Sequence, residues 1–285
     1  MQKVAIVTDS LACLTKELAE QYEISVVPLN IHSNGKVYKD WVDITPDEAY
    51  ELFLKNPESW GSSAPSPMDY LKVFRELGKR TKNILCITVS SKLSTTHDVA
   101  KLAREQAEAE LPQTSIEVVD SQLATAAEGL VALAAAQAAR AGKSLAEVVK
   151  VAEGVRGKVT FVALLDTVRH VYRSGRIPKI AALAGAMLNI RPLLTISSGV
   201  VHFMGAVRNR EHGIERMLKL VKAKVGQRPV HVAVMHAYAL EEAEKLKERV
   251  ASAFNCVELW LTEFSPLMGY ATGTGTLGLA FYPED

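Results

Sequence analysis

Residues 83–111, NILCITVSSKLSTTHDVAKLAREQAEAEL, decide the fold class of this chain. The segment begins with an apolar run rich in β-branched residues (83–89), which predicts a buried strand. A loop of hydroxyl side chains follows, and apolar residues then recur every three or four positions, which predicts an amphipathic helix up to residue 111. SIEVVD (115–120) predicts the next strand. Strand, helix and strand in this order predict one unit of a parallel sheet.

The same alternation extends through the first half of the chain. KVAIV (3–7) and ISVVPL (24–29) predict two more buried strands. Helical spacing recurs at 15–22, 45–56 and 66–80, and each segment begins with Thr or Ser, the residue types that cap helices. An alanine-rich helix is predicted for 126–142, with side chains small enough to lie close against a sheet or another helix. We therefore expect an N-terminal α/β domain at residues 1–157, with a doubly wound and mainly parallel sheet.

The pattern changes in the second half. Strands are predicted at 160–167, 191–207, 230–237 and 256–264, separated by fewer and longer helices, and SSGVV (197–201) has the composition of a hairpin turn. We expect a C-terminal α+β domain at residues 158–285. Because ligands commonly bind between packed domains, we expect the ligand site in the cleft between these two.

Composition and charge argue against several classes of function. The 285 residues carry 33 basic and 32 acidic side chains, a formal net charge of +1, so we expect neither a nucleic-acid partner nor a polybasic membrane anchor. The apolar run before Thr8 is too short for a signal-peptide core or a membrane span, and we expect no stable membrane insertion. Cys86 and Cys256 lie in apolar runs, and with Cys13 they predict buried reduced thiols, as in a cytoplasmic protein.

The C-terminal stretch ATGTGTLGLAFYPED (271–285) places Gly273, Gly275 and Gly278 at the spacing of dinucleotide-binding loops. Such a loop requires a strand before it, a helix after it, and an acidic residue about 20 positions further on. Too few residues follow Gly278 for that unit, and they alternate in hydrophobicity and end like an edge strand. We therefore expect a glycine-rich turn leading into a last strand, and no nucleotide cofactor.

Ligands of open α/β sheets bind beyond the carboxyl ends of the strands, at the N-termini of the following helices, and this rule selects three loops, at 8–10, 60–67 and 90–98. Helix capping alone explains Ser and Thr in any one of these loops. Two hydroxyl-rich loops at the same edge of the sheet nevertheless favour an anion site. Ser94 precedes a helix and would offer an anion both a hydroxyl group and a helix N-terminus.

The alternative reading of Ser94 is a serine hydrolase-like enzyme that acts on an acyl substrate. His97 and Asp98 lie close by in the sequence, but there is no G-x-S-x-G turn to expose the serine, and we expect His97 to be solvated on the first turn of the helix. The histidines form no H-E-x-x-H or H-x-x-E-H motif and the cysteines form no pair, so no metal is expected.

Taken together, the loops resemble those of the DegV family of fatty-acid-binding proteins. The motifs VTDS, SSAPSP, SSKLSTT, VVDS, RSGRI, LNIRPLL and TGTGTLG occur in the order and spacing of that family over nearly the whole chain. The resemblance implies a long-chain fatty acid buried between the two domains, and no catalysis by the chain itself. It also implies a fatty acid kinase as partner, because such proteins act in several Gram-positive bacteria as the FakB subunit of that enzyme, in phospholipid metabolism.

The resemblance also implies which residues hold the carboxylate of the fatty acid. Ser94 matches the family's carboxylate-binding serine, and Thr95 follows it where the family usually has Gly. Ser62 stands where the family usually has Thr, and Arg208 matches an arginine that some members place near the head group. The glycine turn at Gly273 is expected to bring backbone to the head-group end of the tunnel.

The apolar segment IAALAGAMLNI (180–190) offers candidates for the tunnel wall, namely Ile180, Leu183, Met187 and Ile190, with an ordinary core helix as the alternative. A tail of about fourteen methylenes at ~0.8 kcal/mol each represents roughly 11 kcal/mol of gross transfer energy, against about 1 kcal/mol for a neutral hydrogen bond. We therefore expect the tail to supply affinity and the hydroxyl groups to set its direction. In the last motif Ala271 stands where the family usually has His.

Overall fold

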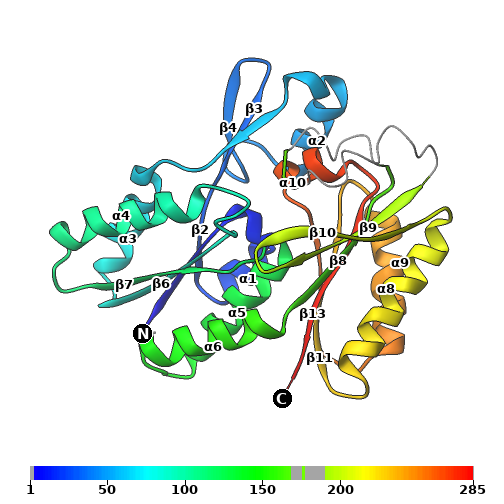
Figure 1. Ribbon diagram of the computed structural model, residues 1–285. Helices are drawn as coiled ribbons and strands as arrows, with labels where there is room; N and C mark the ends of the chain where they lie inside the picture. The colour runs from blue at the N-terminus through cyan, green and yellow to red at the C-terminus, as the bar shows by residue number, and fades with distance from the viewer. Residues whose placement is uncertain (1–2, 168–174, 177–189, 285) are drawn as a thin grey trace.

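The computed structural model describes residues 3–167, 175–176 and 190–284, and these residues form three sheets (Figure 1). The first is a parallel sheet in the order β2-β1-β6-β7. Its strands are β1 (Ala5–Asp9), β2 (Ile24–Val27), β6 (Asn83–Thr88) and β7 (Ser115–Asp120). The strands predicted in the first half of the sequence are thus confirmed, and they pair in parallel as expected.

Helices cover both faces of the parallel sheet. On β6, Ile84 and Cys86 pack with α3 (Pro67–Gly78) and α4 (Thr96–Glu110), whereas Leu85 and Ile87 point to the opposite face, toward α5 (Ala126–Arg140). This alternation follows from the period of two along a strand. Both faces are therefore apolar, which accounts for the continuous hydrophobic runs in the sequence and confirms the doubly wound sheet.

Helix caps fix where several of these helices begin. Thr45 and Ser66 accept hydrogen bonds from the third residue of the helix that follows, and the acidic side chains at those positions bond back in capping boxes. The remaining helices of the first half are α1 (Lys16–Gln21), α2 (Pro46–Lys55), α6 (Leu145–Lys158) and the short 3-10 turns η1 (Ser10–Ala12) and η2 (Pro57–Ser59).

A three-stranded antiparallel sheet in the order β4-β3-β5 extends from the parallel sheet and was not predicted. Its strands are β3 (Asn30–Ser33), β4 (Lys36–Lys39) and β5 (Gly61–Ser63). Asn34 and Gly35 make the β3–β4 turn with φ values of 50° and 75°, as a tight hairpin turn requires. Because β3 pairs with β5, Ser62 lies opposite Ile31 and is held on a strand instead of a loop.

The second half of the chain forms a mixed sheet in the order β10-β9-β8-β13-β11-β12. Its strands are β8 (Thr160–Leu164), β9 (Arg191–Ser197), β10 (Val200–Val207), β11 (Val230–His236), β12 (Cys256–Glu263) and β13 (Leu277–Pro283). The helices here are α8 (Arg210–Val225), α9 (Leu240–Ala253) and α10 (Pro266–Thr272). The predicted α+β character and the hairpin turn at Ser198–Gly199 are confirmed.

The expectation that the last residues form an edge strand was wrong. β13 pairs antiparallel with both β8 and β11, in the interior of the sheet. The side chains of Leu277, Leu279, Ala280 and Phe281 are all fully buried, which covers both faces of the strand. A strand buried on both faces has a nearly continuous apolar sequence, which by itself does not show that neighbours flank it on both sides.

The alanine-rich helix α5 lies between the parallel sheet and the mixed sheet (Figure 1) and contacts strands of both. One hydrophobic cluster consequently includes residues of both halves of the chain. A Cβ atom at Gly129 would collide with the carbonyl oxygen of Ala12 and would come within 3.4 Å of Trp260, so only glycine allows this close approach. The predicted close packing of this helix is confirmed.

Two further features of the described residues bear on the sequence expectations. None of their helices is both long and apolar enough to cross a membrane. Cys13 and Cys86 are buried thiols, but Cys256, expected to be buried, is partly exposed at the start of β12. The predicted domain division at residues 157 and 158 falls at the end of α6, and it stays a prediction.

Candidate functional site

A cavity of about 510 Å³ lies between the two halves of the molecule. The first half contributes η1, β5 and the loop after β6, and the second half contributes β8, β9, β10 and α10. Most of the lining is apolar, as with Leu29, Phe161, Leu194, Ile196 and Phe264. The volume falls within the usual range for small-molecule sites, and the position agrees with the expected cleft.

Polar side chains gather where β5 and the loop after β6 face α10. Ser62, Ser94, Thr95, Lys92 and Arg176 all line the cavity. Two of these residues are basic, and none of the described lining residues is Asp or Glu. A cavity with hydroxyl groups and a guanidinium group at one place and mostly apolar walls elsewhere favours a ligand that has one anionic group and an apolar body.

Ser94 lies two residues before the first residue of α4, and local hydrogen bonds hold it there. Its backbone N–H donates to the carbonyl of Ser90 at 3.1 Å, and its Oγ accepts the N–H of Thr96 at 3.3 Å. The hydroxyls of Ser94 and Thr96 lie 2.8 Å apart, and either can be the donor. When Thr96 donates, the proton of Ser94 is available to an anion, so capping and anion binding are compatible.

Ser62 reaches the cavity from β5. It is partly exposed, and its hydroxyl has no hydrogen-bond partner among the described residues. The neighbouring Ser63 also lines the cavity, but its hydroxyl is engaged, since its Oγ lies 2.9 Å from His32 Nε2 and 3.1 Å from Asn30 Nδ2. Of the two serines on β5, Ser62 therefore has the hydroxyl that is available to a ligand.

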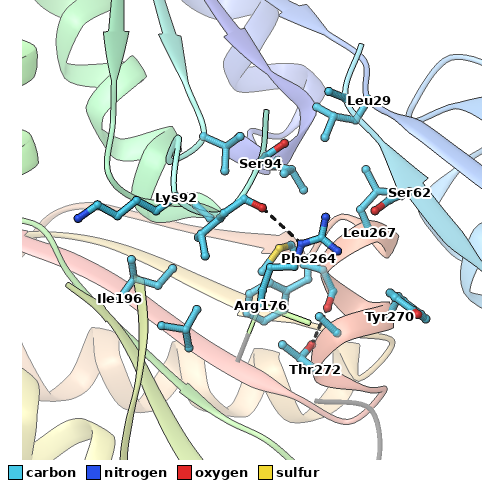
Figure 2. A pocket seen from close by; sticks show the side chains of 18 of the residues that line it. Leu29, Ser62, Lys92, Ser94, Arg176, Ile196, Phe264, Leu267, Tyr270 and Thr272 are labelled. Carbon is cyan, nitrogen blue, oxygen red and sulfur yellow. Dashed lines mark hydrogen bonds between the residues drawn. The ribbon is translucent and has the colours of Figure 1, made fainter. Parts of the chain in front are cut away.

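Arg176 was not among the predicted site residues, although it belongs to the motif RSGRI. Its Nε donates to the carbonyl of Leu93 at 3.4 Å, which attaches it to the loop that carries Ser94. Figure 2 shows its guanidinium group between Ser94 and Ser62, directed into the cavity. A guanidinium beside two hydroxyl groups matches the donor geometry that a carboxylate requires.

The hairpin turn between β9 and β10 holds the Ser94 loop from the other half of the chain. Ser90 Oγ donates to the carbonyl of Gly199 at 2.8 Å, and Lys92 Nζ donates to the carbonyl of Ser198 at 2.9 Å. Gly199 has φ of +81°, and a Cβ atom there would lie 2.7 Å from Ser90 Oγ. In Figure 2 the ammonium end of Lys92 points away from Ser94 and Arg176, consistent with its bond to the hairpin.

Helix α10 closes the side of the cavity near the glycine-rich turn. Tyr270, Ala271 and Thr272 line the cavity, whereas Gly273, at the end of the helix, does not. Gly273 and Gly275 both have φ of +83°, and strand β13 follows them at Leu277. Because a strand instead of a helix comes next, the turn lacks the helix N-terminus that holds a pyrophosphate, as the sequence indicated.

Comparison with known proteins places this arrangement in a family. The profile described as "Uncharacterised protein, DegV family" matches residues 3–284. The chain belongs to the DegV family. A DegV domain-containing protein of Clostridium perfringens is 30% identical over 282 residues, which are 99% of each chain.

Solved structures of DegV proteins share this fold. A fatty-acid-binding DegV protein of Thermus thermophilus superposes with a TM-score of 0.90 at 30% identity, over 99% of this chain and 100% of that one. A stearic-acid-binding protein of Eubacterium ventriosum superposes with a TM-score of 0.90 at 25% identity, over 99% of this chain and 98% of that one. The mixed α/β architecture is therefore that of DegV proteins described as binding fatty acids.

The structure brings some of the predicted residues of this DegV chain together and leaves others apart. Ser62, Ser94 and Thr95 line the cavity. Arg208 is exposed outside it, where its carbonyl accepts a hydrogen bond from Arg191 at 3.1 Å, and Ile190 does not line it either. The other tunnel candidates, Ile180, Leu183 and Met187, lie outside the described residues. The roles of Arg208 and Gly273 in carboxylate binding stay predictions, and their positions give them no support.

The hydrolase alternative finds no support in the hydrogen bonds around Ser94. His97, expected to be solvated, is half-buried, and its Nδ1 lies 3.0 Å from the Oγ1 of Thr88. Burial lowers the pKa of His97. Ser94 is engaged with Thr96, so no described hydrogen bond joins the serine to a base. Among the residues that the structure describes, no cluster of His, Cys, Asp or Glu has the arrangement of a metal site.

Proposed function

We propose that this chain binds a long-chain fatty acid in the cavity, with the carboxylate at Ser62, Ser94 and Arg176 and the tail along the apolar walls. The observation that carries the proposal is the composition of the lining. Hydroxyl groups and the guanidinium group of Arg176 gather at one place, the described lining contains no acidic side chain, and the remaining walls are mostly apolar. The fatty-acid-binding relatives of the same fold support the same ligand class.

The proposed division of energy is unequal between tail and head group. About fourteen methylenes represent roughly 11 kcal/mol of gross transfer energy, part of which association entropy removes. Each hydrogen bond to the carboxylate contributes about 1.5 to 3 kcal/mol at most. The tail therefore provides affinity, and the polar residues select a carboxylate and determine which end of the ligand lies near Ser94.

We further propose that the chain is a cytoplasmic binding subunit that presents its fatty acid to a fatty acid kinase. Thr95 and Lys92 line the cavity and are exposed, so the head-group region lies near the molecular surface. In the proposed reaction a carboxylate oxygen attacks the terminal phosphorus of ATP on the kinase, the bond to ADP breaks, and an acyl phosphate forms. The chain itself supplies the bound and oriented carboxylate, without catalysis of its own.

Solvent extraction of the purified protein, followed by mass spectrometry of the extract, tests the ligand class. We expect about one fatty acid per chain, and replacement of it by added oleate. A purified chain that carries no fatty acid and takes up none from oleate would contradict the proposal.

A second experiment tests the role with a kinase. The oleate-loaded protein is mixed with a purified bacterial fatty acid kinase and ATP, and the acyl phosphate is trapped with hydroxylamine. We expect acyl hydroxamate only when both proteins are present. If the kinase produces none with this chain but does so with its own binding subunit, the chain binds fatty acid for another purpose.

A further inference from the structure

Two acidic side chains lie against each other in the core, behind the wall of the cavity. Asp9 ends β1 and Glu128 lies in the first turn of α5, and both are 0% exposed. Glu128 Oε1 accepts a hydrogen bond from the hydroxyl of Thr8 at 3.1 Å. Neither acid lines the cavity, and the proposed function assigns no role to either.

Asp9 holds two segments of the cavity wall through its carboxylate. Its Oδ1 accepts the backbone N–H of Leu11 at 3.0 Å, and its Oδ2 accepts that of Val89 at 2.9 Å. Leu11 and Val89 both line the cavity, and Val89 leads directly into the loop that carries Ser94. Ala124, which also lines the cavity, lies two residues before the first residue of the helix that carries Glu128. Two parts of the wall thus depend directly on the carboxylate of Asp9.

The surroundings decide the charge of the pair. The titratable groups on neighbouring elements that interact electrostatically with Asp9 or Glu128 are Asp40, Asp120, Tyr70, Cys13 and Cys86. None of these groups is a cation, so nothing among them compensates two negative charges. Burial, the largest cause in each case, raises the pKa of Asp9 to about 7 and the pKa of Glu128 well above its usual value.

Hydrogen bonding assigns the proton to Glu128. Both backbone N–H donors point at Asp9, which stabilises its ionised form. Glu128 Oε2 is buried and accepts no hydrogen bond from any described residue. A buried carboxyl oxygen that accepts no hydrogen bond is costly unless it is protonated. If Glu128 Oε2 carries the proton, it can donate a hydrogen bond to the neighbouring carboxylate of Asp9.

We propose that Asp9 and protonated Glu128 are positioning residues for the cavity wall, and that ligand affinity falls when the pair loses its shared proton. The ligand part of this inference rests on the proposed function. With one proton, the acid–carboxylate hydrogen bond leaves Asp9 bonded to Leu11 and Val89. Without it, two carboxylates repel each other in an apolar surrounding, and the segments attached to them separate.

The direction of the pH effect follows from the raised pKa values. An acid that is harder to ionise in the folded chain than in the unfolded chain favours folding at low pH, and that contribution is lost as pH rises through its folded pKa. The contribution of the pair therefore begins to fall at about pH 4, the usual pKa of a carboxyl group, and is still falling at about 7, the raised pKa of Asp9. Because the pKa of Glu128, which carries the proton, is also raised well above its usual value, stability and affinity should both decline as the pH rises through neutrality.

The test compares wild type with Glu128→Gln, which keeps a donor toward Asp9 but cannot ionise. Oleate affinity is measured by displacement of a fluorescent fatty acid at about pH 6 and about pH 8.5. We expect the affinity of wild type relative to Glu128→Gln to fall about threefold to tenfold between these values. Glu105→Gln, which removes an exposed acid on α4, is the matched control and should follow wild type. A ratio of wild type to Glu128→Gln that is the same at both pH values overturns the inference.

Hydrogen exchange of the Leu11 and Val89 amides gives a readout that needs no ligand. We expect their protection to decline at about pH 8.5 in wild type and to persist in Glu128→Gln. Equal protection in both proteins also overturns the inference. Failure of the wild type to bind oleate contradicts the proposed function, while the amide protection still reports on the pair. If Glu128→Gln does not fold, Asp9→Asn replaces it, because an amide oxygen can still accept one of the two N–H groups and the same loss of pH dependence is expected.

Discussion

Replacing Arg176 by Ala tests whether the cavity recognises a carboxylate. Arg176 donates to the carbonyl of Leu93, and its guanidinium lies between Ser62 and Ser94 (Figure 2). A hydrogen bond to a charged partner contributes about 1.5 to 3 kcal/mol. Because the side chain of Arg176 is exposed, we take the lower end, about 1.5 kcal/mol, which corresponds to about a tenfold loss of affinity. The tail contribution is unaffected, so binding should weaken without disappearing.

The assay is displacement of a fluorescent fatty acid by oleate and, separately, by oleyl alcohol. We expect Arg176→Ala to weaken oleate about tenfold and to change the affinity for the alcohol by less than about twofold, since the alcohol carries no charge. Arg208→Ala is the matched control, because it removes the same charge from an exposed position outside the cavity. It should leave both affinities nearly unchanged.

Two results would refute this reasoning. Equal losses for oleate and oleyl alcohol in Arg176→Ala would mean that the arginine supports the cavity wall and does not pair with the carboxylate. If Arg208→Ala weakens oleate binding as much as Arg176→Ala does, Arg208 contributes to carboxylate binding, as the family resemblance implies. The position of Arg208 outside the cavity would then not exclude it from the site.

Three further predictions concern the hydroxyl groups, the hairpin and the bond between α2 and Phe264. Ser94→Ala and Ser62→Ala should each weaken oleate binding by about 1 to 3 kcal/mol, and unchanged titrations for both would exclude them from the site. Gly199→Ala should cost about 1 to 3 kcal/mol of stability in thermal unfolding and should weaken oleate binding. The reason is that Gly199 has a φ of +81° and that a Cβ atom there would collide with Ser90. Unchanged stability and binding would show that the hairpin does not hold the Ser94 loop. Tyr50→Phe should cost about 1 to 3 kcal/mol in denaturant unfolding, since it removes the 2.9 Å bond to the carbonyl of Phe264, and a cost near zero would mean that another donor replaces it.

Much of the fold follows from patterns that are local in the sequence. The apolar run at β6 and the three-to-four spacing after it need only their own residues to be recognised, and the caps at Thr45 and Ser66 begin α2 and α3 as predicted. The position of Ser94 was also accessible, because side chains after a strand of a parallel sheet gather at its carboxyl edge. The resemblance to the DegV family covered the same loops and is confirmed by the family match.

Other features depend on partners that the sequence does not reveal. β13 is interior because β8 and β11 flank it, and an apolar run does not say how many neighbours a strand has. The hairpin of β3 and β4 does have a local signal, because Asn34-Gly35 is a dipeptide typical of tight hairpin turns. His97 is half-buried and contacts Thr88, which lies on the preceding strand β6. The spacing of residues along α4 alone does not predict that contact.

The sequence by itself therefore determined the strands of the parallel and mixed sheets, most of the helices, and the hydroxyl loops at the edge of the parallel sheet, because periodicity, caps and strand ends are local properties. Only the tertiary structure decided which residues meet at the cavity. Ser90 and Gly199 bond across 109 positions of chain, and Arg176 reaches the Ser94 loop across 83. Arg208 shares the charge of Arg176, but the fold leaves it outside the cavity. Contacts of that range arise from how the two sheets pack around α5, and no short pattern of residues encodes them.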